Sequence, residues 1–316
     1  MIALASKLMH ADVIQVGPGS ASIPQKLARI FTRRMRNRGR DESCLLIGAG
    51  PGDLVRIFRM ERWRERFGFV GAWIIDSFWL DHISRSVIWS RPFDHLFVTS
   101  LEDIDAWKRI TRSPVTWVPW GSDVLGLGCG EHDREWDVTR VGRQPKEWDD
   151  DSACLDTASG YGIRYQGRPP GDGMTALENQ LNMMRVYSSS KYILAFSNLV
   201  NREAYTHPTR DYITGRWVDA LACGSVVAGI PPRGEGTREL LWPGATLDFE
   251  SVRMREGMEA LASALAGWTP AVSVKNYTTA LRKLDWRWRF RTIADTMGIK
   301  PDPLYRELAL LPGSPG

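Results

Sequence analysis

The chain has 316 residues, of which 43% are hydrophobic and 25% charged, and its formal net charge is +4. These values are close to the globular average, so they exclude disordered and fibrous classes, and the length suffices for two ordinary domains. The sequence shows no apolar run of about 18 residues, no secretory signal and no paired spacing among its four cysteines. We therefore expect a cytoplasmic protein with reduced thiols.

The first half of the sequence alternates short apolar runs with amphipathic stretches, which is typical of βαβ units around a parallel sheet. The predicted strands are Asp12–Val16, Cys44–Ile47, Phe69–Ile75, His95–Thr99 and Val115–Val118. The predicted helices are Pro24–Asn37, Asp53–Phe67, His82–Trp89 and Leu101–Ile110. Right-handed crossovers would place these helices on both faces of the sheet.

A second series of strands and helices follows the glycine-rich stretch Gly126–Gly130. Its predicted strands are Asp137–Val141, Tyr192–Phe196, Ser225–Gly229 and Ala245–Phe249. Its predicted helices are Gly173–Val186, Gly215–Ala222, Arg233–Leu241, Arg255–Ala266 and Ser273–Leu284. Residues 149–173 are polar and rich in Gly and Pro, which predicts a long loop. The expected organisation is an N-terminal Rossmann-like domain over residues 1–124, a C-terminal one over 125–284, and a last helix with a frayed tail over 285–316.

The segment that follows His207 carries the clearest chemical signal. A loop leads to a predicted helix start at Thr214–Gly215, and a helix N-terminus presents backbone N–H groups to a phosphate. Arg216, in the first turn, can add a bidentate contact to that phosphate. Gly224 follows the helix, where a glycine C-cap is expected. The segment thus predicts a phosphate site at the start of this helix.

Two carboxylates accompany this predicted phosphate site. Asp219, within the helix, is placed to accept hydrogen bonds from ribose hydroxyls, and Asp211, ahead of the helix, is placed to face a sugar. The spacing Asp211-x7-Asp219 followed by Ala-x-Ala-x-Gly resembles the donor-binding region of retaining GT-B glycosyltransferases. Glu239 resembles the Glu-x-x-x-x-Gly stretch of the same family. The family normally has Glu at both carboxylate positions, whereas this chain has the shorter Asp.

Two further segments carry the resemblance. Arg143 and Lys146 follow a predicted strand as Val-Gly-Arg-Gln-Pro-Lys, and they resemble the family's Gly-Arg and Lys, whose cations hold the donor diphosphate. Val118-Pro-Trp-Gly-Ser-Asp123 resembles the family's Pro-x-Gly-x-Asp at the domain junction. The resemblance implies a GT-B fold, with two Rossmann-like domains facing a central cleft and a final helix, after residue 285, that returns to the N-terminal domain. It also implies transfer from a nucleotide diphosphate sugar to an acceptor hydroxyl with retention, as in carbohydrate biosynthesis.

The resemblance implies that no divalent metal is required, because the helix dipole and the cations cover the leaving diphosphate. The acidic clusters Asp149-Asp150-Asp151 and Asp103-Ile-Asp105 are interpreted as solvated faces and not as metal ligands. One family feature is missing: a His after an N-terminal strand, near the transferred sugar. The corresponding stretch contains Asp76 and Ser77, either of which could replace it, and His82 is a weaker candidate.

Three other interpretations remain open. The stretch Gly48-Ala-Gly50-Pro-Gly52 follows a strand, like the fingerprint of an NAD(P)- or SAM-dependent enzyme, although Asp53 occupies the position of its third Gly or Ala. The Asp-for-Glu replacements and the missing His are also compatible with a catalytically silent protein that binds nucleotide sugars. The basic stretch Lys26–Arg40 is either a solvated helix face or a weak contact with an anionic membrane. No nucleic-acid-binding module is recognisable, and the acceptor is not named by the sequence.

Overall fold

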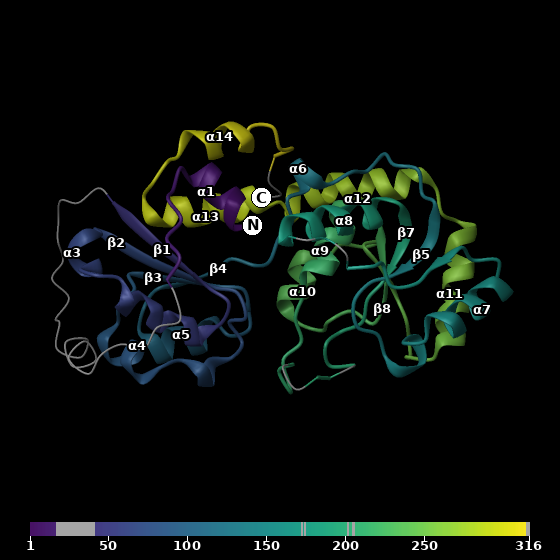
Figure 1. Cartoon of the computed structure of the whole chain (residues 1–316), viewed down its shortest axis with the longest axis horizontal. Helices are drawn as coiled ribbons and strands as arrows, with labels where there is room; N and C mark the ends of the chain where they lie inside the picture. Colours follow the sequence, from purple (N-terminus) through teal and green to yellow (C-terminus); the bar gives the residue numbers. More distant parts are fainter. Residues whose placement is uncertain (17–41, 172, 174, 201, 204–205, 314–316) are drawn as a thin grey trace. The chain divides into compact units, whose positions relative to one another are not determined.

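The computed structural model describes residues 1–16, 42–171, 173, 175–200, 202–203 and 206–313 (Figure 1). The chain divides into two compact units, an N-terminal one of residues 2–119 with 289–305 and a C-terminal one of residue 1, residues 120–288 and the end of the chain. Each unit is built on its own parallel sheet, so the prediction of two α/β units is confirmed. The helix predicted over Pro24–Asn37, and with it the membrane contact through Lys26–Arg40, lies outside the described residues.

The N-terminal unit contains a four-stranded parallel sheet in the order β1-β2-β3-β4. Its strands are β1 (Ser43–Gly48), β2 (Phe69–Ile74), β3 (His95–Val98) and β4 (Val115–Trp117). The helices around it are α1 (Ile2–Met9), η1 (Pro51–Arg59), α3 (Trp63–Arg66), η2 (Leu80–His82), α4 (Arg85–Ser90) and α5 (Ile104–Thr111). The core forms where the strands present Ile74, Leu96 and Val98 to Leu54 of η1 and Trp107 of α5.

Two predictions for this unit are wrong. Asp12–Val16 forms no strand, because its apolar side chains have no sheet to cover: Val13 and Ile14 are 59% and 51% exposed. The helix predicted over Asp53–Phe67 is interrupted between η1 and α3, where Met60 is extended and Arg62 has a left-handed φ of 49°. Helical periodicity in the sequence therefore covered two short helical segments, of which the first is a 3-10 helix.

The C-terminal unit contains a five-stranded parallel sheet in the order β6-β5-β7-β8-β9. Its strands are β5 (Trp136–Arg140), β6 (Tyr165–Gln166), β7 (Ser190–Leu194), β8 (Val226–Gly229) and β9 (Thr246–Asp248). Its helical segments are α6 (Val124–Leu127), η3 (Lys146–Trp148), α7 (Asp151–Gly160), α8 (Ala176–Ser188), α9 (Gly215–Ala222), α10 (Glu235–Leu240), α11 (Met254–Ala266) and α12 (Pro270–Lys283). The chain passes from β5 outward to β6 and then returns to the other side of β5 as β7, which creates a topological switch point.

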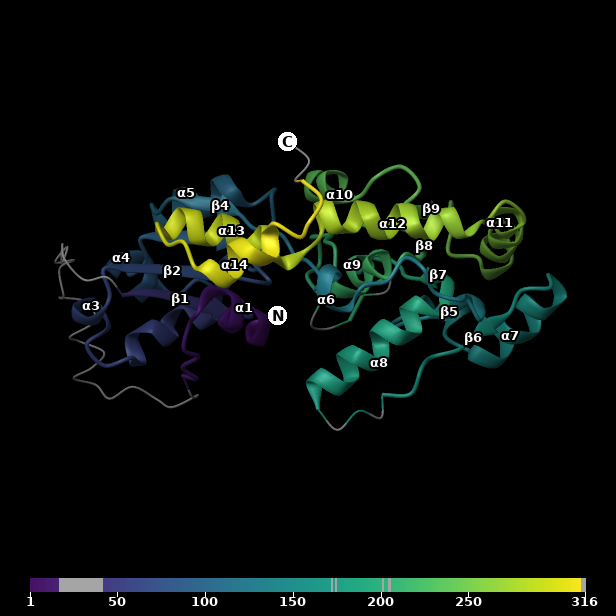
Figure 2. The ribbon, with the colours of Figure 1, turned by 90° about the horizontal axis from the view of Figure 1, so that it is seen from above.

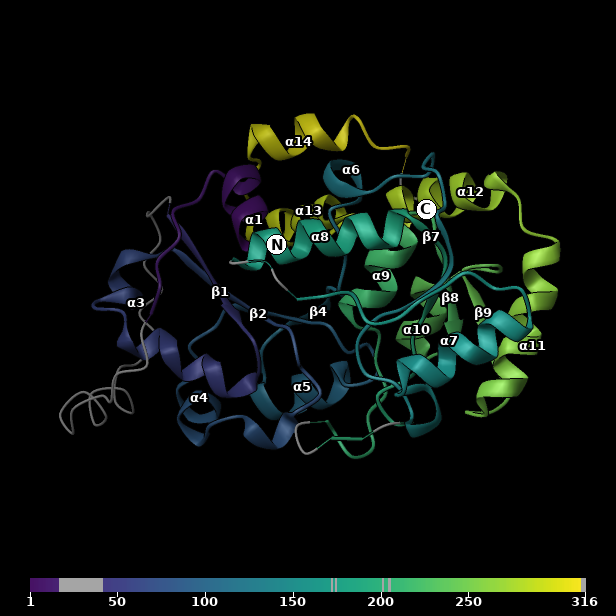
Figure 3. The same ribbon diagram turned by 45° about the vertical axis from the view of Figure 1, so that its right-hand side comes forward.

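Helices cover both faces of this sheet. Helices α7 and α11 pack side by side over one face (Figure 1). Their Cys154, Ala158, Met258 and Leu261 share a hydrophobic core with the apolar side chains of the strands. Helices α8, α9 and α12 cover the other face, with α9 between the other two (Figures 2 and 3). The sheet is therefore buried on both sides, which explains why the second half of β7, from Tyr192, and the whole of β8 read as apolar runs in the sequence.

The loop predicted over residues 149–173 is wrong, because this stretch contains α7 and β6. The sequence of α7, Asp-Ser-Ala-Cys-Leu-Asp-Thr-Ala-Ser-Gly, has little amphipathic contrast, and small residues form its buried side. The tail also contains two helices where one was expected, α13 (Trp286–Met297) and α14 (Asp302–Leu308). Within the described residues, no helix is long and apolar enough to cross a bilayer.

The contact between α11 and Trp148 gives a test of this packing. A Cβ atom on Gly257 would lie 2.5 Å from Trp148 Cζ2, and the Trp148 ring is fully buried, with its Nε1–H donated to the Val252 carbonyl. We expect Gly257→Ala to lower the free energy of unfolding by about 1–3 kcal/mol, measured by urea denaturation. Gly160→Ala is the matched control, because its Cβ meets no atom within 4 Å, and it should be neutral or stabilise by up to about 1 kcal/mol. Equal effects of the two variants would contradict the packing.

Candidate functional site

The carboxyl ends of β5 and β7 are where the topology predicts a ligand. In open parallel sheets, ligands bind beyond the carboxyl ends of the strands, at the switch point. The turn Val141-Gly142-Arg143 follows β5, and Ser197 and Asn198 follow β7. Several of the predicted site residues are attached to these two turns.

Asp211 is fixed between the ends of two strands. The Ser197 hydroxyl, after β7, donates to Asp211 Oδ1 at 2.6 Å, and the backbone N–H of Arg233, after β8, donates to Oδ2 at 2.9 Å. Burial raises the pKa of Asp211, and these hydrogen bonds together with that from the Tyr212 backbone partly oppose the rise. Asn198 holds the same loop through its side-chain bond to the Arg210 carbonyl, at 2.8 Å. The carboxylate predicted to face the sugar is thus held by strand ends, although it lies on a loop.

Helix α9 starts at Gly215 and ends before Gly224, as predicted. Thr214 is the N-cap residue, but its side chain does not cap the helix, and its buried Oγ1 has no hydrogen-bond partner among the described residues. Gly224 has a φ of 78°, the left-handed conformation expected after the helix. A Cβ on Gly215 would lie 3.2 Å from Trp120 Nε1, so the indole lies against the first turn of the helix. The helix thus begins without a cap from the Thr214 side chain, next to the indole N–H of Trp120.

Arg216 connects the start of α9 to the turn after β5. Its Nη1 donates to the carbonyls of Val141, at 3.3 Å, and Arg143, at 3.1 Å. The turn between these carbonyls depends on Gly142, which has a φ of 72°. These bonds were not anticipated from the sequence, where Arg216 is predicted to contact phosphate. They bring its guanidinium and the turn of Arg143 into direct contact.

The remaining predicted donor-binding residues differ in their surroundings. Arg143 is half-buried, and its Nη1 donates to Thr206 Oγ1 at 3.2 Å. Lys146, on η3, and Glu239, on α10, are exposed. The structure therefore connects Arg143, Arg216 and the start of α9 by direct contacts, whereas Lys146 and Glu239 lie on the surface of the same unit.

Asp219 lies in the second turn of α9 and has two side-chain donors that the sequence did not suggest. Ser122 Oγ donates to Oδ1 at 2.6 Å, and Gln180 Nε2, from α8, donates to Oδ2 at 3.2 Å. Burial raises the pKa of Asp219 to about 6, while the two donors act in the opposite direction. Ser122 comes from the Pro-x-Gly-x-Asp segment, which the sequence identified only as a junction.

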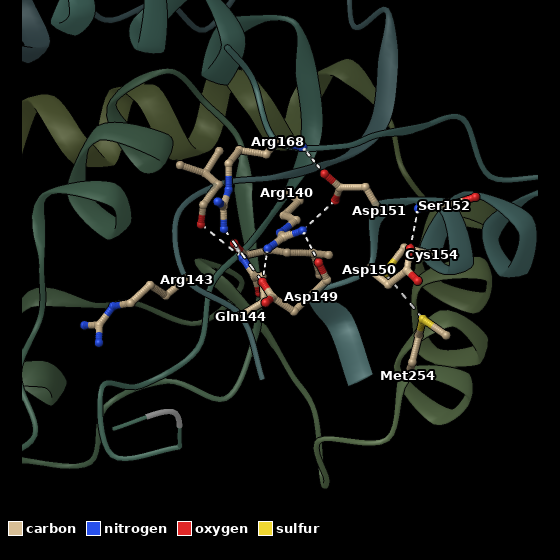
Figure 4. A network of polar contacts seen from close by, with 12 residues as sticks. Arg140, Arg143, Gln144, Asp149, Asp150, Asp151, Ser152, Cys154, Arg168 and Met254 are labelled. Carbon is tan, nitrogen blue, oxygen red and sulfur yellow. Dashed lines mark hydrogen bonds and ion pairs between the residues drawn. The ribbon is translucent and has the colours of Figure 1, made fainter. Parts of the chain in front are cut away.

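The acidic run 149–151 is organised around a buried arginine (Figure 4). Arg140 is 2% exposed, and its guanidinium donates to the carboxylates of Asp149 and Asp151. Asp150 instead caps α7, by accepting from the backbone N–H groups of Ser152 and Ala153 at 2.9 and 3.1 Å. The network closes the loop that carries Arg143, whose side chain points away from it (Figure 4). Two of the three acids are thus ion-pair partners, and the described residues contain no group of three His, Cys, Asp or Glu arranged to hold a metal.

The N-terminal candidates lie in the turn after β2. Asp76 is exposed overall, but partial burial of its carboxyl group raises the pKa of that group. Ser77 is fully buried, and its Oγ accepts from the backbone N–H groups of Thr99 and Ser100, so it is a structural residue. His82 is exposed and stacks on Trp79, with ring centroids 4.9 Å apart. Of these three residues, Asp76 retains the features of a catalytic candidate.

The glycine stretch after β1 has an arrangement that opposes dinucleotide binding. The Asp53 Oδ2 atom accepts the backbone N–H groups of Ala49 and Gly50, at 2.9 and 3.4 Å, which are the donors that a pyrophosphate would need. The segment that follows is the 3-10 helix η1, and among the described strands β1 pairs with β2 alone. The loop therefore has an internal carboxylate where a cofactor phosphate would bind.

The sequence profile of the glycosyl transferase-like family matches residues 132–295, just over half of the chain. The chain belongs to this family. The matched region starts just before β5 and ends in α13, so it includes both turns, helix α9 and Asp211. The resemblance to glycosyltransferases noted in the sequence is confirmed. No curated protein sequence matches the chain.

Two solved structures are similar to the chain at low sequence identity. HepE of Anabaena, in complex with UDP, has a TM-score of 0.49 and 12% identity over 80% of this chain and 78% of HepE. TarM has a TM-score of 0.47 and 8% identity over 80% of this chain and 53% of TarM. A structure of a mutant of S. aureus TarM has a TM-score of 0.42 and 7% identity over 84% of this chain and 54% of that chain.

Two glycines distinguish the site from the dinucleotide interpretation. Gly142→Ala places a side chain at a φ of 72° and 2.9 Å from Arg216 Nη1, so we expect a loss of about 1–2 kcal/mol in the free energy of unfolding. Gly50 has a φ of −147° and open space around its Cβ, so Gly50→Ala should change stability by less than about 0.5 kcal/mol. Chemical denaturation measures both. A large loss in the free energy of unfolding for Gly50→Ala, without one for Gly142→Ala, would contradict the conclusion that the fold requires the glycine at position 142 and not the one at position 50.

Proposed function

We propose that the chain transfers a glycosyl group from a nucleotide diphosphate sugar to an acceptor hydroxyl, with the donor bound at the carboxyl ends of β5 and β7. The supporting observation is the direct contact between the start of α9 and the turn of Arg143, made by Arg216 at the switch point. This contact lies inside the region that matches the family profile. The acceptor is left open.

The chemistry of a diphosphate leaving group fits these residues. Negative charge develops on the diphosphate as the glycosidic bond breaks, and donors that are already in place stabilise it without reorganisation. The start of α9 supplies backbone N–H groups at Thr214 and Gly215 and the positive end of a helix dipole. Arg143, Arg216 and, from the surface, Lys146 supply positive charge. In this proposal the cations and the helix do the work that a divalent metal does in other transferases.

The carboxylates have separate roles in the proposal. Asp211, held by Ser197 and the Arg233 backbone, orients the transferred sugar. Asp219 accepts hydrogen bonds from the ribose, Glu239 assists on the donor side, and Asp76 is the catalytic candidate of the N-terminal unit. Transfer with retention follows from the family resemblance alone. Its test is the anomeric configuration of the first sugar released from the donor, read by NMR before mutarotation.

Calorimetric titration with UDP, GDP, ADP and NAD tests the position of the donor site. We expect one nucleoside diphosphate to bind in the micromolar range, about −8 kcal/mol, and NAD not to bind. Arg143→Ala and Asp219→Ala should each weaken that binding at least about tenfold, since each removes a charged hydrogen-bonding group. Arg255→Ala is the matched control, because Arg255 is 84% exposed on α11. Binding of NAD, or variants indistinguishable from the parent protein, would reject the proposal.

Donor hydrolysis in the presence of a chelator tests metal independence. Because Asp149 and Asp151 are bound to Arg140, we expect the rate of nucleoside diphosphate release to be the same with EDTA and with excess magnesium. A rate that collapses with EDTA and returns with magnesium would show that a metal is required. Tight donor binding with no release under either condition, and with any acceptor tried, would instead favour a catalytically silent nucleotide-sugar-binding protein.

A further inference from the structure

The carboxylate of Asp219 connects three separate parts of the chain. Ser122 is 97 residues away in sequence and Gln180 is 39 residues away, yet both donate a hydrogen bond to it. Ser122 is 1% exposed and its backbone is also fixed, because its N–H donates to the Leu284 carbonyl at 2.9 Å and its carbonyl accepts from Trp286 N at 2.9 Å. Gln180 approaches from α8, which packs beside α9. The two donors therefore reach Asp219 from independently anchored segments.

The position of this carboxylate suits a group attached to the bound diphosphate. Asp219 Oδ2 lies 3.6 Å from the Cβ position of Gly215, so the carboxylate lies over the first turn of α9. The ribose of a nucleoside diphosphate is bonded directly to the phosphate that this turn would bind. An ionised carboxylate has about four acceptor sites, and Ser122 and Gln180 each use one, on different oxygens. Acceptor capacity therefore remains on both oxygens for two hydroxyls.

We propose that Ser122 and Gln180 are positioning residues, which hold the Asp219 carboxylate for the ribose hydroxyls of the nucleotide-sugar donor. The inference rests on the proposed function, because it requires a nucleotide donor at α9. It adds two residues to the site and assigns the junction segment, through Ser122, a role in donor recognition. Neither residue contacts the reacting sugar in this scheme.

The titration of Asp219 makes this role measurable. Its pKa is raised to about 6 by burial, and the Ser122 and Gln180 bonds stabilise the ionised form. The other titratable groups that interact with it are Tyr187, whose pKa is raised well above its usual value, Cys223, whose pKa is raised to about 12, and the Met1 amino group. Tyr187 and Cys223 stay neutral near neutral pH, so they do not interfere. Loss of either donor removes stabilisation of the carboxylate and raises its pKa further.

The experiment is nucleoside diphosphate binding as a function of pH, by calorimetry with UDP, GDP and ADP in turn, for proteins with the same N-terminus. For the parent protein, affinity should be constant above about pH 6 and fall up to tenfold per pH unit below it, as Asp219 is protonated. For Ser122→Ala and Gln180→Met, the fall should begin about one pH unit higher, with affinity recovered at high pH. Gln180→Glu should shift it further than Gln180→Met, since a second carboxylate disfavours ionisation. Ser159→Ala, on the exposed side of α7, is the matched control.

The possible outcomes distinguish a failure of the positioning role from a failure of the proposed donor site. Variants that weaken binding equally at every pH, or that follow the parent curve, overturn the positioning role while donor binding stands. If Ser122→Ala does not fold, Gln180→Met still tests the positioning role, because Gln180 is only half-buried on α8. If the parent protein binds none of the three nucleotides, or if Asp219→Asn binds as the parent does, the proposed donor site itself is wrong.

Discussion

The hydrogen bonds from Arg216 to the carbonyls of Val141 and Arg143 are the interaction on which the candidate site depends. The parallel sheet fixes where β5 ends, but it does not fix how a neighbouring helix points at that end. Arg216 fixes this orientation, because it lies in the first turn of α9 and its guanidinium is rigid. The same side chain places a permanent positive charge between the backbone N–H groups at the start of α9 and the turn that carries Arg143. Arg216 thus contributes both to the position of α9 and to the positive charge at the switch point.

Arginines have a similar structural role elsewhere in the C-terminal unit. Arg134 is 8% exposed and donates to the carbonyls of Tyr187, Ser190 and Cys223. Arg140 joins the loop after β5 to the start of α7. Buried carbonyls at the ends of elements need donors, and a guanidinium offers five in a fixed plane. The unit therefore holds irregular backbone with buried cations, and not only with apolar packing.

The elements that local chemistry decides could be predicted from the sequence. Helix α9 was predicted at its observed bounds, because Gly215 and Gly224 mark its ends and an apolar strand follows at once. Elements whose partners are distant in sequence, or whose buried side chains are small, could not be predicted. Helix α7 presents Cys154 and Ala158 to the core, a stripe too weak to see by periodicity. Ser122 and Gln180 could not be assigned to Asp219, since nothing in a sequence shows that residues 97 and 39 positions apart will meet.

The carboxylate of Asp53, three residues after Gly50, changes the meaning of the glycine stretch that follows β1. It behaves as a ligand tethered to its own binding loop, and such a ligand has an effective concentration on the order of millimolar or more. A free phosphate group would have to compete with a partner that never diffuses away, and it would also be repelled by the charge of that partner. One acid in place of the third small residue thus converts a sequence that looks like a cofactor loop into a self-saturated turn, whose glycines serve the bend between β1 and η1.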